Sequence, residues 1–222
     1  MGATTSIPNS IDVNQIISNT GLSKKQICAL WTRFYELDRD ARGDCQGYKG
    51  YIDVDDLARV PKFDENPIAS RLIKVIFDDF GSNGKLTFSQ FVDFMSTFAQ
   101  RKRSGHHQER HSSTQTIITT ATKTDLESIK YSPDDTERIR KIKFIFSMYD
   151  IDRNGRLSKE DVQEILKMMV GKINDDEASI IAEKIIGEFT EDQPNTTVTL
   201  ENFEKTLHTL DFNDKMSLKL LK

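Results

Sequence analysis

The chain has 222 residues, and its 31 Lys and Arg residues against 35 Asp and Glu residues leave a formal net charge of −4 at pH 7. This balance excludes a general attraction to nucleic acid, whose binding proteins usually present a basic face. Two cysteines are too few for a disulfide framework, and no apolar run approaches the roughly 18–20 residues that cross a bilayer. With 11 Gly and 5 Pro residues, the composition favours a helical protein, which we expect to be cytoplasmic.

Apolar residues recur at helical spacing in several segments. The first stripe follows Ser23, a predicted N-cap, and runs over residues 27–37. A second helix is predicted to open with Pro67 at its first position, and a third to span residues 89–100. Further helices are predicted at residues 139–149, 162–169, 178–189 and 202–210. We therefore expect an all-α fold.

Residues 101–136 differ in composition from the rest of the chain. They contain a basic patch at 101–103, three of the four histidines, and a Ser/Thr-rich run at 112–124. We interpret this segment as a long flexible linker between two helical lobes. The predicted organisation is an N-terminal segment 1–20, an N-terminal lobe 21–100, the linker 101–136 and a C-terminal lobe 137–222.

The first six residues, Met-Gly-Ala-Thr-Thr-Ser, fit the pattern for N-myristoylation of Gly2. One acyl chain gives only marginal, reversible membrane binding, so a stable attachment needs a second contact. The basic patch at 101–103 could supply it by contacting anionic lipid headgroups. This pattern predicts a peripheral location at the plasma membrane, with a chance match to a short motif as the alternative.

The segment 150–161 fits the twelve-residue loop of an EF-hand, in which oxygen ligands at positions 1, 3, 5, 7, 9 and 12 surround Gly at position 6. Gly155 allows the sharp turn at position 6. We predict a Ca²⁺ site with the ligands Asp150, Asp152, Asn154, the carbonyl of Arg156, Ser158 and Asp161. Because Asp161 at position 12 is one methylene shorter than the usual Glu, Mg²⁺ is expected to compete. An acidic turn without an ion is the alternative.

Three other loops share this outline and depart from the ligand pattern. The loop 79–90 lacks an oxygen ligand at position 3 and a carboxylate at position 12, so we expect it to stay empty. The loop 38–56 spans 19 residues, which is too long to wrap an ion, and the loop 191–202 has Thr196 in place of Gly. An aliphatic residue at position 8 lets two loops pair through a short β-bridge. The residues at this position are Ile52, Leu86, Leu157 and Val198. This spacing predicts four helix–loop–helix units in two pairs.

Several short motifs give the chain a family resemblance. They include Thr20-Gly21, Arg33-Phe34, Asn66-Pro67, Met148-Tyr149-Asp150, residues 167–171 (Lys-Met-Met-Val-Gly) and Lys215-Met216-Ser217. With these motifs, the chain resembles the calcineurin B family, and most closely the calcineurin B homologous proteins. The resemblance implies a non-catalytic protein that clasps an amphipathic helix of a larger protein. For the homologous proteins that helix belongs to a plasma-membrane Na⁺/H⁺ exchanger, and for calcineurin B to the phosphatase catalytic subunit.

Helix binding in a groove needs an adaptable apolar surface, which Met and Phe side chains supply. The candidates for the groove are Phe91, Phe94, Phe98, Phe144, Met168 and Met169, although core packing is the alternative for each. No Gly-rich phosphate loop and no nucleophile–base pairing suggest an enzyme. A stand-alone calcium sensor or buffer remains a further alternative, which predicts that no partner is bound.

Overall fold

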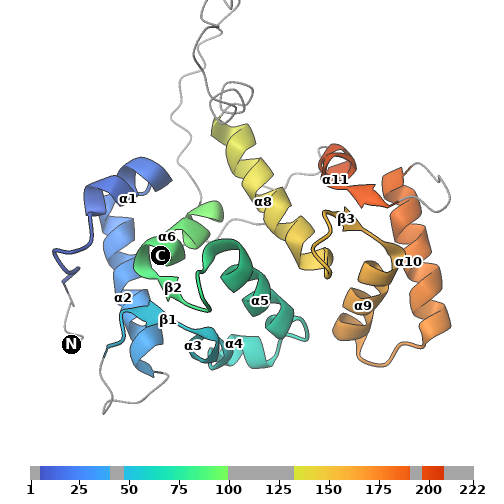
Figure 1. Ribbon diagram of the computed structural model, residues 1–222, viewed down its shortest axis with the longest axis horizontal. Coiled ribbons are helices and arrows are strands. Elements are labelled where there is room, and N and C mark those ends of the chain that lie inside the picture. The colour runs from blue at the N-terminus through green and yellow to red at the C-terminus, as the bar shows by residue number, and fades with distance from the viewer. Residues whose placement is uncertain (1–5, 41–47, 100–132, 191–196, 208–222) are drawn as a thin grey trace, which may run out of the picture.

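The computed structural model describes residues 6–40, 48–99, 133–190 and 197–207, and these residues form a mostly helical protein (Figure 1). In the first half, α1 (Val13–Thr20) precedes two helix–loop–helix units. Their elements, in chain order, are α2 (Lys24–Asp40), β1 (Tyr51–Ile52), α3 (Val54–Ala58), α4 (Pro61–Asp64), α5 (Ala69–Phe80), β2 (Leu86–Thr87) and α6 (Phe88–Thr97).

The second half repeats the arrangement with two further units. Their elements are α8 (Pro133–Tyr149), β3 (Arg156–Leu157), α9 (Lys159–Val170), α10 (Asp175–Thr190), β4 (Val198–Thr199) and α11 (Leu200–Leu207). The prediction of four helix–loop–helix units is thereby confirmed. Among the described helices, none has both the length and the apolar composition that a bilayer-spanning segment needs.

Short antiparallel bridges join the loops in the two predicted pairs. Ile52 pairs with Leu86 in the first half, and Leu157 pairs with Val198 in the second. All four side chains are buried. The prediction of the position-8 residues is confirmed, because an aliphatic side chain at that position both bridges its partner loop and fills the core below it.

Helix α2 shows how the local sequence produces one of these elements. Ser23 caps it as predicted: the Ser23 Oγ accepts the backbone N–H of Gln26 at 3.3 Å, and the Gln26 Oε1 accepts that of Ser23 at 2.9 Å. This reciprocal pair satisfies two amides at the helix start. The predicted stripe is buried along its length, at Ile27, Leu30, Trp31, Phe34 and Leu37.

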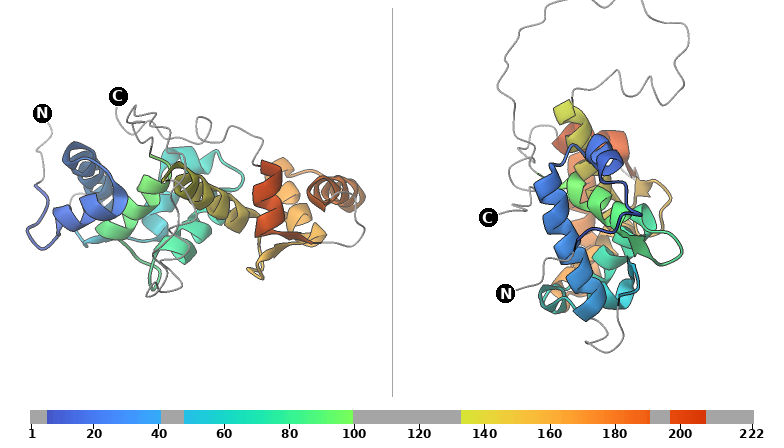
Figure 2. Two further views of the ribbon diagram at one scale, coloured as in Figure 1. Left: turned by 90° about the horizontal axis from the view of Figure 1, so that it is seen from above. Right: turned by 90° about the vertical axis from the view of Figure 1, so that its left-hand side faces the viewer.

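The apolar core consists of two clusters, one in each half, and α8 contributes to both. Phe144 and Met148 belong to the first cluster, together with Trp31 of α2, whereas Ile142 and Phe146 belong to the second. Figures 1 and 2 show α8, in yellow, lying between the two groups of helices. The two halves therefore share a helix rather than meeting only through a linker.

Two predicted boundaries are corrected, and one helix is added. Helix α8 begins at Pro133, inside the segment 101–136 that we interpreted as linker, and residues 101–132 lie outside the described part of the chain. Helix α5 begins at Ala69 instead of Pro67, because the Asn66 Oδ1 accepts the N–H of Ile68 in a turn that precedes the helix. Helix α1 was not predicted.

Candidate metal centre

Three carboxylates converge in the loop 150–161. Oxygen atoms of Asp150, Asp152 and Asp161 all lie within 4.8 Å of one another, the one such acidic group in the described residues. Asp150 follows the last residue of α8, and Asp161 lies in the first turn of α9. Asp150 and Asp161 are each 5% exposed, whereas Asp152 faces solvent. The end of one helix and the start of the next therefore bring the charges together.

Backbone amides hold Asp150 in place at loop position 1. Its Oδ1 accepts the N–H of Asn154 at 3.1 Å, and its Oδ2 accepts that of Gly155 at 2.9 Å. Gly155 makes this possible with a φ of 79°, in the left-handed region that favours glycine. The loop is thus wrapped around the Asp150 carboxylate.

Asp161 closes the loop from the other end. Its Oδ2 accepts from both the backbone N–H and the Oγ of Ser158, at 2.9 and 2.6 Å, in a capping box at the start of α9. Its Oδ1 accepts the N–H of Ile151 at 3.1 Å. Position 12 is therefore fixed against the beginning of the loop.

Electrostatics of the loop favour a cation. Burial raises the pKa of Asp150 above its ordinary value. Hydrogen bonds from the amides of Gly155 and Asn154 partly oppose this rise, and the charge of Asp161 adds to it. The charged form of a buried carboxylate close to a second one is unfavourable unless a cation neutralises it. The donors here are hard oxygens, which suit Ca²⁺ and Mg²⁺.

The remaining predicted ligands lie on the same loop. The Asn154 Oδ1 accepts the N–H of Arg156 at 2.8 Å, and its Nδ2 donates to the Asp152 Oδ2 at 2.8 Å. Arg156 is the first residue of β3, and Ser158 caps α9. All six predicted residues thus lie on one loop, and they would hold a divalent ion through side-chain oxygens and the Arg156 carbonyl.

Changing Gly155 to Ala tests this loop conformation. We expect Gly155→Ala to lower the free energy of unfolding by about 1–2 kcal/mol, because a side chain disfavours the left-handed backbone. An added Cβ meets no atom within 4 Å, so the loss is conformational and not steric. Gly84→Ala, at the matching position of the loop 79–90, is expected to show the same loss in thermal melts. Unchanged melting of both variants would contradict this account.

The loop 79–90 is closed by its own polar groups. Asn83 and Gly84, with φ values of 53° and 68°, form a tight turn. At position 12, the Gln90 Nε2 donates to the Ser82 Oγ at 3.0 Å. Position 12 therefore carries a neutral amide where the metal loop has the Asp161 carboxylate, which supports the prediction that the loop binds no ion.

Residues 191–196 lie outside the described part of the chain, so the structure describes only the end of the fourth loop. There, the backbone N–H of Asn202 donates to the Thr199 Oγ1 at 3.3 Å. The prediction that Thr196 impairs this loop stays a prediction. Gly2 and the basic patch 101–103 likewise lie outside the described residues.

The predicted groove residues occupy different environments. Phe91, Phe98 and Phe144 are buried in the first core cluster, and Phe94 is packed against it. The rings of Phe94, Phe98 and Phe144 contact one another, with the centroids of Phe98 and Phe144 5.2 Å apart, whereas the ring of Phe91 contacts that of Phe34. In this structure these four side chains therefore form core rather than a groove. Met168 is partly exposed on α9, and Met169 is half exposed beside it.

Two arginines that we did not predict connect the metal loop to the first half. Arg71 of α5 is buried and donates to the backbone carbonyls of Ser147, Met148 and Asp150 at 2.6, 3.1 and 2.6 Å. Arg153, within the loop, pairs with Asp78 and Asp79 of α5 at 3.2 and 2.8 Å. No local motif signals such contacts, because the partners are more than 70 residues apart in sequence.

The chain is similar to several known proteins. Residues 139–207 match the family described as an EF-hand domain pair. The chain is 29% identical over 221 residues to the calcineurin B subunit of Naegleria gruberi, covering 99% of this chain and 100% of that protein. It is 27% identical over 204 residues to the calcineurin B subunit of Schizosaccharomyces pombe, covering 91% and 92%. A solved chain of a PP2A PR70 holoenzyme aligns with a TM-score of 0.48 and 15% identity, covering 93% of this chain and 67% of that one.

Proposed function

We propose that the chain is a calcineurin B-like EF-hand protein, a Ca²⁺-binding regulatory subunit that holds an amphipathic helix of a larger protein. The observation that carries the proposal is the loop 150–161, whose buried carboxylates lie at the joint between α8 and α9. An ion bound there neutralises these charges and fixes the two helices relative to each other, which links calcium to the surface they carry.

We propose a phosphatase catalytic subunit as the partner. Both relatives are named as a subunit of calcineurin, which supports this partner over the cytosolic region of a Na⁺/H⁺ exchanger, the partner implied by the resemblance to the homologous proteins. Membrane attachment through myristoylated Gly2 and the basic patch 101–103 stays part of the proposal, as does the division into two lobes, of which the second begins with α8 at Pro133.

The exposed apolar side chains suggest where the partner helix binds. Large hydrophobic residues that are exposed in the described part of the chain are Tyr48, Val54, Met169, Val170, Ile180 and Ile181. Four of these six lie on α9 and α10, the pair of helices that follows the metal loop. Aliphatic residues and Met on helices suit an amphipathic helix from a partner.

Affinity capture of the tagged full-length chain, with Ca²⁺ or with chelator, tests the function. Recovery of a phosphatase catalytic subunit is the expected result, and dependence on Ca²⁺ separates a sensor from a permanently attached subunit. Recovery of a Na⁺/H⁺ exchanger would replace the proposed partner. Absence of any stoichiometric partner would favour the sensor or buffer alternative.

Substitution of Ile180, which is 68% exposed, tests the binding surface. We expect Ile180→Lys to reduce recovery of the partner at least tenfold, because a charge cannot be desolvated against an apolar helix without loss. The melting temperature should barely change, since the side chain faces solvent. Val54→Lys, which changes an exposed apolar residue of the first half, is the matched control. Equal recovery with both variants would place the partner elsewhere.

A further inference from the structure

The loop 38–56 keeps the second half of an EF-hand loop. Because Ile52 pairs with Leu86 as the position-8 residue, Gly50 falls at position 6 and Lys49 at position 5. Gly50 has a φ of 86°, close to the 79° of Gly155 in the metal loop. At the other end, Asp53 and Asp56 form the capping box of α3, as Ser158 and Asp161 do for α9.

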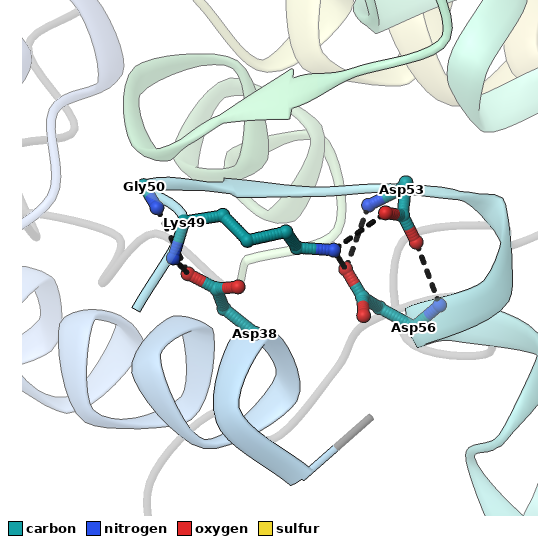
Figure 3. Close-up of polar contacts among 5 residues, drawn as sticks. All are labelled: Asp38, Lys49, Gly50, Asp53 and Asp56. Carbon is teal, nitrogen blue, oxygen red and sulfur yellow. Dashed lines mark hydrogen bonds and ion pairs between the residues drawn. The ribbon is translucent and has the colours of Figure 1, made fainter. Parts of the chain in front are cut away.

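Asp38 takes the place of a position-1 ligand in spite of the inserted residues. Its Oδ2 accepts the backbone N–H of Lys49 at 2.8 Å and that of Gly50 at 2.9 Å (Figure 3). Asp150 accepts the amides of the two corresponding residues in the metal loop. Both aspartates are buried. The insertion therefore leaves the hydrogen bonds of the position-1 aspartate in place, and our expectation that the loop is too long to wrap an ion stays a prediction.

The side chain at position 5 distinguishes the two loops. In the metal loop this residue is Asn154, an oxygen donor, whereas here it is Lys49. Figure 3 shows the Lys49 side chain running from the region of Asp38 to Asp53 and Asp56. Its Nζ lies 2.5 Å from the Oδ2 of Asp53 and 2.5 Å from the Oδ2 of Asp56. The ammonium thus bridges the carboxylates at positions 9 and 12.

Burial and charge suit a resident cation. The Lys49 side chain is only 11% exposed and that of Asp56 only 1%. Burial opposes the charged form, but the hydrogen bonds to Asp53 and Asp56 raise the pKa of Lys49 above its ordinary value. Burial raises the pKa of Asp56, while the pKa of Asp53 is lowered, against its own burial, by the hydrogen bond from Lys49. Removal of the ammonium would leave the buried Asp56 carboxylate without a counter-charge, which is strongly destabilising.

We propose that the first EF-hand loop is a cation site whose occupant is the Lys49 ammonium. The ammonium satisfies the carboxylates that would otherwise ligate a divalent ion, and it excludes that ion by occupying its ligand shell. The first EF-hand is consequently assembled at any Ca²⁺ concentration, and the calcium response is confined to the second half of the chain. This inference concerns the first loop alone and does not depend on the proposed partner.

The test uses the full-length chain with Asp150→Asn, so that the metal loop contributes no calcium response. Fluorescence of Trp31, the single tryptophan, reports on the first half, since it is buried and its ring lies 5.8 Å from that of Tyr48, the neighbour of Lys49. In the Asp150→Asn chain, which is the parent of the variants below, millimolar Ca²⁺ or Mg²⁺ is expected to leave the melting temperature unchanged. Lys49→Asn, which installs the position-5 residue of the metal loop, should melt about 5 °C or more lower in chelator.

Divalent ions should then rescue the Lys49→Asn variant, raising its melting temperature towards that of the parent. Lys49→Arg, which keeps a cation, is the matched control and should not respond to Ca²⁺. If Lys49→Asn does not fold, Lys49→Met combined with Asp56→Asn removes one charge of each sign and should fold in chelator. Three results would overturn the proposal. The first is a Ca²⁺ response of Trp31 in the parent, and the second is a Lys49→Asn variant that is as stable as the parent in chelator and unaffected by Ca²⁺. The third is failure of the double variant to fold.

Discussion

Asp150→Asn is expected to lower the Ca²⁺ affinity of the chain about a hundredfold or more, since it removes a buried charged ligand from position 1. The asparagine keeps the size of the side chain and an oxygen that can still accept from Asn154 or Gly155, so the loop retains much of its structure. Calorimetry of the full chain should therefore change from one bound ion to none in the accessible concentration range. Undiminished stoichiometry would contradict the assignment of the loop 150–161.

Thermal melts provide a second readout of the same variant. An ion at a hundred times its dissociation constant stabilises the folded chain by about 2.7 kcal/mol, so the original chain should melt higher in Ca²⁺ than in chelator. The Asp150→Asn variant should melt at the same temperature in both. Glu160→Gln is the matched control, because Glu160 is an exposed carboxylate of the same loop at position 11, which is not a ligand position. It should retain both the calcium stoichiometry and the calcium-dependent stabilisation.

Those features of the fold that depend on local periodicity could be predicted from the sequence. The stripe from Ile27 to Leu37 and the position-8 residues are buried in the structure as predicted. They could be predicted because each depends on a single repeat length in the sequence. The metal loop could be predicted for the same reason, since its ligands occur within twelve residues. Periodicity cannot show which buried ring belongs to core and which to a groove, and Phe144 accordingly lies in the first cluster.

Features that depend on contacts between distant segments could not be predicted. The sequence placed Ile52 at position 8 of the first loop, but the insertion between Asp38 and Lys49 concealed that Asp38 still accepts the amides at positions 5 and 6. A lysine at a ligand position also suggests a damaged loop when read alone. Its role as counter-charge depends on the distance from its Nζ to Asp56, which no spacing rule supplies.

Arg71→Met is expected to lower the free energy of unfolding by roughly 3 kcal/mol, because it removes a buried charged donor and leaves three carbonyls without it. Arg71 is 4% exposed and donates to the last residues of α8 and to Asp150, where a positive charge also complements the helix C-terminus. Methionine preserves the unbranched stem and so limits the cavity. Denaturant unfolding of the full chain in chelator measures the loss.

The same substitution should weaken Ca²⁺ binding about three- to tenfold, since Arg71 holds the carbonyl of Asp150, the residue whose carboxylate would ligate the ion. Arg140→Gln is the control: Arg140 also joins α8 to the first half, through Asp93 at 2.7 Å, but both side chains are substantially exposed. An exposed pair contributes about 1 kcal/mol at most. If Arg71→Met and Arg140→Gln had equal effects on stability and none on calcium affinity, the metal loop would be energetically independent of α5. A larger effect of Arg71→Met than of Arg140→Gln on both stability and calcium affinity would mean that α5 of the first half positions the calcium site of the second.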